Sequence, residues 1–219
     1  MNANTNRIML TLFYVGIFVI YYLITLLITL LPNAATLRSN GLLVPVVCLF
    51  EFAAIWPIYR FYCSRRDDIP PGTLRLTTTL LFIAGLALLL LLQSQVLQPE
   101  AWLEQQSHQS RAAVLILVFT AVALGPVFEE ILFRGFMLQG FLLWAPKSPL
   151  ASVTLTSILF AAMHTQYVHL QTLAMLTLFS MLLCYARLKS NGLKLPIFLH
   201  MVNNLLALLP ALYATLLNG

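Results

Sequence analysis

Charged residues are scarce in this sequence. Only 9% of its 219 residues are Asp, Glu, Lys or Arg and 60% are hydrophobic, whereas a typical soluble domain is about 25% charged. No polar stretch is long enough to form a separate soluble domain. We therefore expect one all-α membrane domain over residues 1–219. The formal charge of +5 is spread over short loops between apolar segments, so we expect no nucleic-acid partner.

Several catalytic signatures are also missing. The three cysteines, Cys48, Cys63 and Cys184, are scattered, which predicts neither a disulfide framework nor a metal site. No G-x-S-x-G motif marks a nucleophilic serine, and Ser157 and Ser180 read as small packing residues. The N-terminus has no short apolar region with a clear cleavage site, so we expect its first helix to be retained.

Long apolar runs dominate instead. A spanning helix needs about 20 apolar residues, and proline, glycine and asparagine breakers separate about seven candidates. These candidates are residues 8–31, 42–62, 76–92, 112–143, 150–165, 170–188 and 195–217.

The basic residues favour one orientation of these spans. With the N-terminus in the cytoplasm, the inner loops and helix ends hold nine basic residues: Arg7, Arg60, Arg65, Arg66, Arg75, Lys147, Arg187, Lys189 and Lys194. The outer loops hold only Arg38 and Arg111. By the positive-inside rule we expect a multi-pass protein of a bacterial cell membrane with a cytoplasmic N-terminus.

Two adjacent acidic residues, Glu129 and Glu130, interrupt the fourth apolar run. Each carboxylate at bilayer depth costs about 2.5–3.5 kcal/mol, so such a residue indicates a functional site. Arg134 follows Glu130 at the i, i+4 spacing and can form an ion pair with it on one helix face. Glu129 points about 100° away and is left without that partner.

Counting along the helices predicts which side chains meet. Glu129 and His164 both lie about 21 Å from the turn that joins their helices, so they are level. His200 lies only about 12 Å from the turn at Gly192. The depths agree if the hairpin of 112–165 projects about 9 Å into the cytoplasm. On that geometry these three side chains and Asn204 line a cavity that opens on the cytoplasmic side.

This set of residues contains the parts of a hydrolase. A carboxylate beside an imidazole can take a proton from water, and imidazole and amide N–H groups can stabilise an oxyanion. The motifs are E-E-x-x-x-R at 129–134, F-x-x-x-H at 160–164 and H-x-x-x-N at 200–204. In this order, on separate helices, they resemble the CPBP family of intramembrane proteases, which includes the CAAX prenyl endopeptidases and the bacterial Abi group.

The resemblance covers residues 112–209 as a catalytic core, while residues 1–111 carry no recognised motif. It implies an intramembrane glutamic endopeptidase with Glu129 as the catalytic glutamate. By the same resemblance His164 assists in activating water, His200 and Asn204 form the oxyanion site, and Glu130 and Arg134 are structural support. The expected partners are membrane lipids and a protein or peptide substrate, which in some members is lipidated.

Three other hypotheses remain open from sequence. The chain could be a membrane immunity or scaffold protein without proteolytic activity. It could be a metal-dependent protease, because one glutamate and two histidines can ligate zinc, although we expect no cofactor. A transporter fits less well, since no symmetry of broken helices relates the two halves. Glu51, within the second span, has no partner that the sequence can name.

Overall fold

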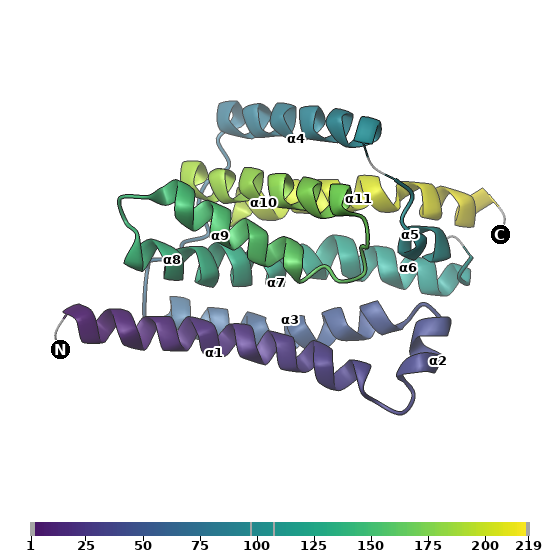
Figure 1. The fold of residues 1–219 in the computed structure, drawn as a ribbon, viewed down its shortest axis with the longest axis horizontal. Helices are drawn as coiled ribbons and strands as arrows, with labels where there is room; N and C mark the ends of the chain where they lie inside the picture. Colours follow the sequence, from purple (N-terminus) through teal and green to yellow (C-terminus); the bar gives the residue numbers. More distant parts are fainter. Residues whose placement is uncertain (1–2, 97, 107, 218–219) are drawn as a thin grey trace.

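The computed structural model describes residues 3–96, 98–106 and 108–217, and these residues form helices joined by short loops (Figure 1). The first half contains α1 (Ala3–Thr29), α2 (Ala34–Ser39), α3 (Leu43–Cys63), α4 (Leu76–Val96) and α5 (Ala101–Gln106). A long composite helix follows, made of α6 (Arg111–Phe119), η1 (Thr120–Leu124), α7 (Gly125–Glu130), η2 (Ile131–Met137) and α8 (Leu138–Trp144). The last three helices are α9 (Pro149–Ala162), α10 (Leu170–Ser190) and α11 (Lys194–Leu217).

Six of these segments are long and apolar enough to cross a membrane: α1, α3, α4, the composite helix 111–144, α10 and α11. The all-α bundle predicted from the sequence is therefore confirmed. The fifth predicted span is shorter than expected, because α9 has 14 residues and is about 21 Å long, less than the thickness of the hydrocarbon core. The short helices α2 and α5 were not predicted.

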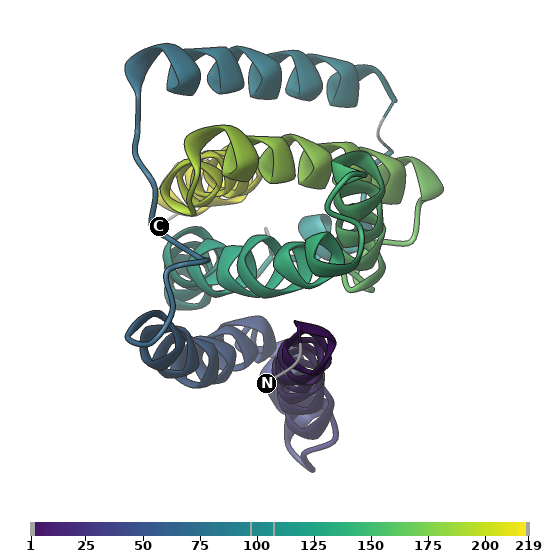
Figure 2. The ribbon, with the colours of Figure 1, turned by 90° about the vertical axis from the view of Figure 1, so that its left-hand side faces the viewer.

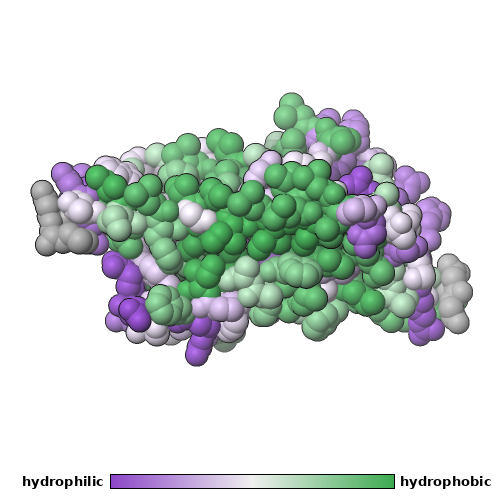
Figure 3. Space-filling model, turned by 90° about the horizontal axis from the view of Figure 1, so that it is seen from below, coloured by the Kyte–Doolittle hydropathy of each residue, from purple (hydrophilic) through white to green (hydrophobic). Residues whose placement is uncertain are grey.

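The helices form layers, with α1 and α3 on one side, the composite helix, α9, α10 and α11 in the middle, and α4 on the other side (Figure 2). Figure 3 shows the face seen from the α1 side, where an apolar band crosses the middle and polar residues gather at both ends. Many large side chains of α1 are exposed, including Leu12 and Leu27, each 62% exposed. Lipid contact accounts for such a surface.

The two ends of the bundle differ as the alternation of spans predicts. The N-terminus and the loops after α3, α8 and α10 lie at one end, and α2, α5, the 163–169 loop and the C-terminus lie at the other (Figure 1). We call these the basic end and the α2/α5 end, because the first carries nine of the basic residues counted above.

Aromatic packing joins α1 and α3 to the composite helix. Phe136, fully buried, contacts Tyr14 and Tyr62 with ring centroids 5.6 and 5.4 Å apart. Phe133 packs edge-on against Phe160 of α9, at 5.1 Å. Since lipid offers helices no hydrophobic drive to associate, such close packing supplies much of the attraction.

Two glycines allow the loop after α3 to touch the turn before α11. Gly72 has a positive φ of 71°, and Lys194 donates its backbone N–H to the Pro71 carbonyl at 2.9 Å. A Cβ on Gly192 would lie 2.1 Å from the backbone of Gly72. No side chain fits at this contact, which ties the loop after α3 to the turn before α11.

Replacing Gly192 by alanine should therefore destabilise the protein by about 1–3 kcal/mol, the usual cost of overpacking. The measurement is the free energy of unfolding in an SDS titration of the purified protein. Gly16→Ala is the matched control, because a Cβ at Gly16 meets no atom within 4 Å. Equal stability of the two variants would contradict the close contact.

Candidate active site

The composite helix is widened just before the acidic pair. Over Thr120–Leu124 it is a π-helix, in which each N–H reaches back five residues rather than four. Pro126 accounts for the change, because in an α-helix its ring would clash with the carbonyl four residues earlier. The Gly125 N–H bonds to the Thr120 carbonyl, five residues back.

This widening leaves one backbone carbonyl available. In the π register the Ala121 carbonyl would accept from residue 126, but that residue is proline and has no N–H. Asn204 of α11 fills the place, donating its Nδ2–H to the Ala121 carbonyl at 2.9 Å. The amide oxygen of Asn204 accepts from Nδ2 of Asn203 at 3.3 Å. The second N–H of Asn204 has no partner among these contacts.

Glu130, the second residue of the acidic pair, belongs to a buried network of charged and polar groups. Arg134 donates to Oε1 of Glu130 at 2.8 Å and to the hydroxyl and carbonyl of Ser180 at 2.7 and 3.2 Å. His200 donates its Nδ1–H to the same Glu130 oxygen at 2.7 Å. The side chains of Glu130 and Arg134 are fully buried. The i, i+4 pairing predicted from the sequence is present, but Ser180, which we read as a packing residue, belongs to the network.

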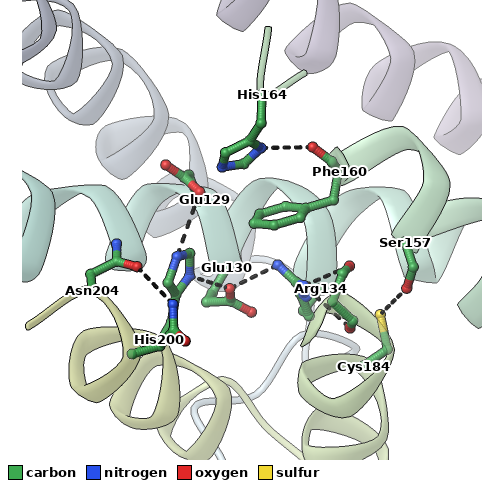
Figure 4. Close-up of polar contacts among 11 residues, drawn as sticks. Glu129, Glu130, Arg134, Ser157, Phe160, His164, Cys184, His200 and Asn204 are labelled. Atoms are coloured by element: carbon green, nitrogen blue, oxygen red, sulfur yellow. Dashed lines mark hydrogen bonds and ion pairs between the residues drawn. The ribbon is translucent and has the colours of Figure 1, made fainter. Parts of the chain in front are cut away.

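Glu129 lies on the other side of His200. Its Oε2 is 3.9 Å from Nε2 of His200 (Figure 4) and accepts no hydrogen bond from any described residue. The side chain keeps 17% of its surface exposed, whereas that of Glu130 has none. The two adjacent glutamates therefore differ in environment: one is held by an ion pair, and the other has a free carboxyl oxygen.

His164 follows the end of α9 and lines the same cavity as Glu129. Its Nδ1–H donates to the Phe160 carbonyl at 2.8 Å, which leaves the lone pair of Nε2 available when the ring is neutral. In Figure 4 the Glu129 carboxyl lies between the rings of His164 and His200. The Phe160 ring contacts both His164 and Arg134. Its centroid is 4.5 Å from that of the His164 ring and 4.5 Å from the Arg134 guanidinium.

All four side chains predicted to be catalytic line one cavity of about 270 Å³: Glu129, His164, His200 and Asn204. Apolar residues make up much of its wall, among them Leu176 and Phe179. Asn203 and Glu51 also line it, and the motifs gave no signal for either. Glu51 is an isolated acidic residue in an apolar run, which was the available hint.

The cavity extends towards the α2/α5 end of the bundle. We expected its opening on the side that carries the N-terminus, but its lining continues to Thr29, Leu43 and Trp102, at the α2/α5 end. The buried Glu130–Arg134 pair and the fully buried Phe133 and Phe136 lie on the basic-end side of Glu129 along the composite helix. Distances counted along helices give depth, but they do not say which end the side chains block.

Within the described ranges, no three His, Cys, Asp or Glu side chains are grouped so that they could hold a metal ion. The Nδ1 atoms of His164 and His200 are both engaged in hydrogen bonds, which leaves each ring one nitrogen for another partner. The expectation that the protein uses no cofactor stays a prediction.

Glu100, just before α5, holds the loop that carries His164. Its carboxylate accepts from the Thr172 hydroxyl at 2.5 Å and from the backbone N–H groups of Val168 and His169. Trp102 then packs edge-on against Tyr167, which stacks on His164. The unpredicted helix α5 thus helps to position this imidazole.

Comparisons with known proteins identify the region that contains these residues. Residues 111–206 match the family model described as type II CAAX prenyl endopeptidase Rce1-like. An Escherichia coli protein described as an uncharacterized 24.3 kDa protein is 42% identical over 96 residues, which are 44% of this chain and 44% of that protein. The match thus spans less than half of either protein. No solved structure matches.

The buried ion pair predicts a double-mutant result. Arg134→Met should lower the free energy of unfolding by about 3–5 kcal/mol, because it removes the arginine from a fully buried pair and leaves Glu130 with His200. Glu130→Gln in the same chain should recover part of that loss. SDS titration of the single and double variants measures both effects. If the double variant is no more stable than Arg134→Met, Glu130 does not depend on the arginine.

Glu100 predicts a pH dependence of stability. Burial raises the pKa of its carboxyl, but the hydrogen bonds from Thr172, Val168 and His169 outweigh burial and lower that pKa from its ordinary value. The stabilisation is therefore complete above the ordinary glutamate pKa of about 4.3 and is lost as the pH falls through the lowered value. Thermal unfolding should show wild type above Glu100→Gln at neutral pH, with the gap closing in acid. A gap that is independent of pH would contradict this.

Proposed function

We propose that this multi-pass membrane protein, whose residues 111–206 belong to the type II CAAX prenyl endopeptidase Rce1-like family, is an intramembrane glutamic endopeptidase. It would hydrolyse a peptide bond in a membrane-associated or lipid-anchored protein or peptide. One observation carries this proposal: the Glu129 carboxyl, free of hydrogen bonds at Oε2, faces a histidine nitrogen inside a largely apolar cavity.

Glu129 would act as the general base. A water molecule between Oε2 of Glu129 and Nε2 of His164 would give a proton to the carboxylate and a hydrogen bond to the imidazole. The remaining hydroxide attacks the carbonyl carbon of the substrate, and the carbonyl oxygen becomes an oxyanion. The hydrogen bond from His164 to Phe160 supports this role, because it turns the Nε2 lone pair of the neutral ring towards the cavity.

His200 and Asn204 would stabilise the oxyanion. His200 gives its Nδ1–H to Glu130, so it can donate a second hydrogen bond only as an imidazolium that carries a proton on Nε2. In that form the ring would lie between the carboxyl groups of Glu129 and Glu130. The second N–H of Asn204 is the other donor.

Collapse of the tetrahedral intermediate completes the reaction. The C–N bond breaks, and Glu129 returns the proton that it took from water to the departing amine. The carboxylic acid and amine products leave, and the carboxylate of Glu129 is restored. No covalent enzyme intermediate is needed, in agreement with the lack of a recognisable serine or cysteine nucleophile.

The substrate would enter from the α2/α5 end, through which the cavity extends. If the basic end lies in the cytoplasm, as the distribution of Lys and Arg favours, the cavity opens on the opposite side of the membrane. A cysteine placed in α2 or α5 should then react with an impermeant maleimide applied from outside intact cells. Reaction only after the cells are opened would reverse this orientation.

Replacing Glu129 by Gln should abolish cleavage, with a loss of at least 10²–10⁴-fold for a missing general base, and leave folding intact. The measurement compares the protein termini of membranes that contain wild type or the variant, to find peptide bonds cut only by wild type. Glu104→Gln, an exposed acidic residue in α5, is the matched control and should keep full activity. Full activity of Glu129→Gln would refute the proposal and favour a protein without proteolytic function.

His200→Ala and Asn204→Ala should lower kcat by about 10²–10³-fold and change KM much less, because the oxyanion exists only in the transition state. Steady-state kinetics on a cleaved peptide separates the two parameters. An equal effect on KM would assign these residues to substrate binding. Loss of wild-type activity to strong chelators, restored by added zinc, would replace this mechanism with a metal-dependent one.

A further inference from the structure

A third carboxyl group lines the cavity and has no part in the proposed mechanism. Glu51 belongs to α3, in the half of the chain outside the region that matches the family model. Its side chain is 3% exposed and lies in the wall that also contains Glu129. One oxygen, Oε1, accepts from the hydroxyl of Thr25 on α1 at 2.5 Å.

The surroundings of Glu51 contain no positive partner. Among the described residues it forms no ion pair, and none of those that line the cavity is lysine or arginine. The arginine of the active-site network, Arg134, is engaged by Glu130 and Ser180 and lies behind the Phe160 ring. The charged form of such a buried carboxyl is costly unless a cation joins it, and otherwise a proton neutralises it.

The other polar groups of the cavity add to the preference for a cation. The free nitrogen of His164 is an acceptor when its ring is neutral, and Glu129 has a free carboxyl oxygen. Two carboxyls thus stand in a mostly apolar wall, where a charge–charge interaction is stronger than in water. Of these two carboxyl groups, His200 lies close only to that of Glu129.

We propose that Glu51 is a specificity-determining residue that binds the basic side chain of a lysine or arginine close to the bond that is cleaved. This inference rests on the proposed function, which supplies the peptide substrate. The basic side chain would replace the missing cation beside Glu51 while Glu129 acts on the peptide bond. Thr25 would position the carboxyl group through its hydrogen bond.

A merely structural role is the competing interpretation, since the Thr25–Glu51 hydrogen bond also joins α1 to α3. The two interpretations differ in what the charge does. Glu51→Gln keeps an acceptor for Thr25 and removes only the charge, whereas Thr25→Val removes the hydrogen bond and keeps the charge. These two variants therefore form a matched pair.

The first experiment uses full-length protein in liposomes and a library of peptides with randomised residues around a central segment. Mass spectrometry identifies the bonds cleaved by wild type and not by Glu129→Gln. Wild type should favour lysine or arginine near the cut by about tenfold over norleucine. Glu51→Gln should lose that preference and still cleave neutral peptides, and Thr25→Val should retain it. Cleavage without a basic preference, or a preference that survives in Glu51→Gln, overturns the inference.

A binding measurement does not depend on cleavage. Nα-dansyl-lysine octylamide and its norleucine counterpart are titrated into Glu129→Gln liposomes, and energy transfer from Trp102, which lines the cavity, reports occupancy. Trp102→Phe shows which part of the signal comes from the cavity. The lysine probe should bind about tenfold more tightly, and Glu51→Gln in the same chain should remove the difference. Equal binding of the two probes overturns the inference.

The two experiments keep the proposals apart. If no bond is cleaved in a Glu129-dependent way, the proposed function fails; a lysine preference in binding still supports the cation site. If cleavage occurs and neither assay shows a basic preference that depends on Glu51, the inference fails while the proposed function stands.

Discussion

The buried pair of Glu130 and Arg134 is the interaction on which the site depends. It places two charges inside a membrane bundle at a cost that only close pairing can offset. Because Oε1 of Glu130 accepts from both Arg134 and His200, the same carboxylate sets the position of the imidazole and determines which of its nitrogens faces Glu129. The two adjacent glutamates point in different directions from the helix, Glu130 into the packed core and Glu129 into the cavity.

A second constraint comes from a proline. Pro126 has no N–H to give to the widened turn before it, and the freed carbonyl of Ala121 accepts from Asn204. The unpaired carbonyl in the composite helix therefore forms a hydrogen bond with α11. This contact fixes the amide of Asn204 near the cavity, and Pro126 achieves it without an additional polar side chain in the bundle.

Much of this arrangement could be predicted from the sequence. The length of the apolar runs predicts the helices, the loop charges predict which loops share an end, and the i, i+4 spacing predicts the pairing of Glu130 with Arg134. The grouping of Glu129, His164, His200 and Asn204 was expected from depth and from the motifs, and the structure brings these four side chains to one cavity. The roles assigned to them stay predictions.

Other features depend on packing that a linear pattern does not record. Ser180 reads as a small residue until Arg134 is seen to reach across from another helix. The extent of the cavity towards Thr29, Leu43 and Trp102 also depends on how the helices pack, which the apolar pattern does not record. The π-helical turns change the register of the composite helix, so counting at 1.5 Å per residue does not describe it fully. The length of α9 was overestimated because no proline or glycine marks its end at Ala162.

The position of His200 and Asn204 on α11 has a consequence for biogenesis. Glu129 enters the bilayer with the composite helix, long before α11 is synthesised, and at that stage neither Glu130 nor the Ala121 carbonyl has its partner from the last helix. In a nascent chain the Glu130 carboxylate and the Ala121 carbonyl therefore lack these partners until α11 has docked. The arrangement of Glu130, His200 and Asn204 is therefore completed by the docking of α11 and not by the insertion of the composite helix.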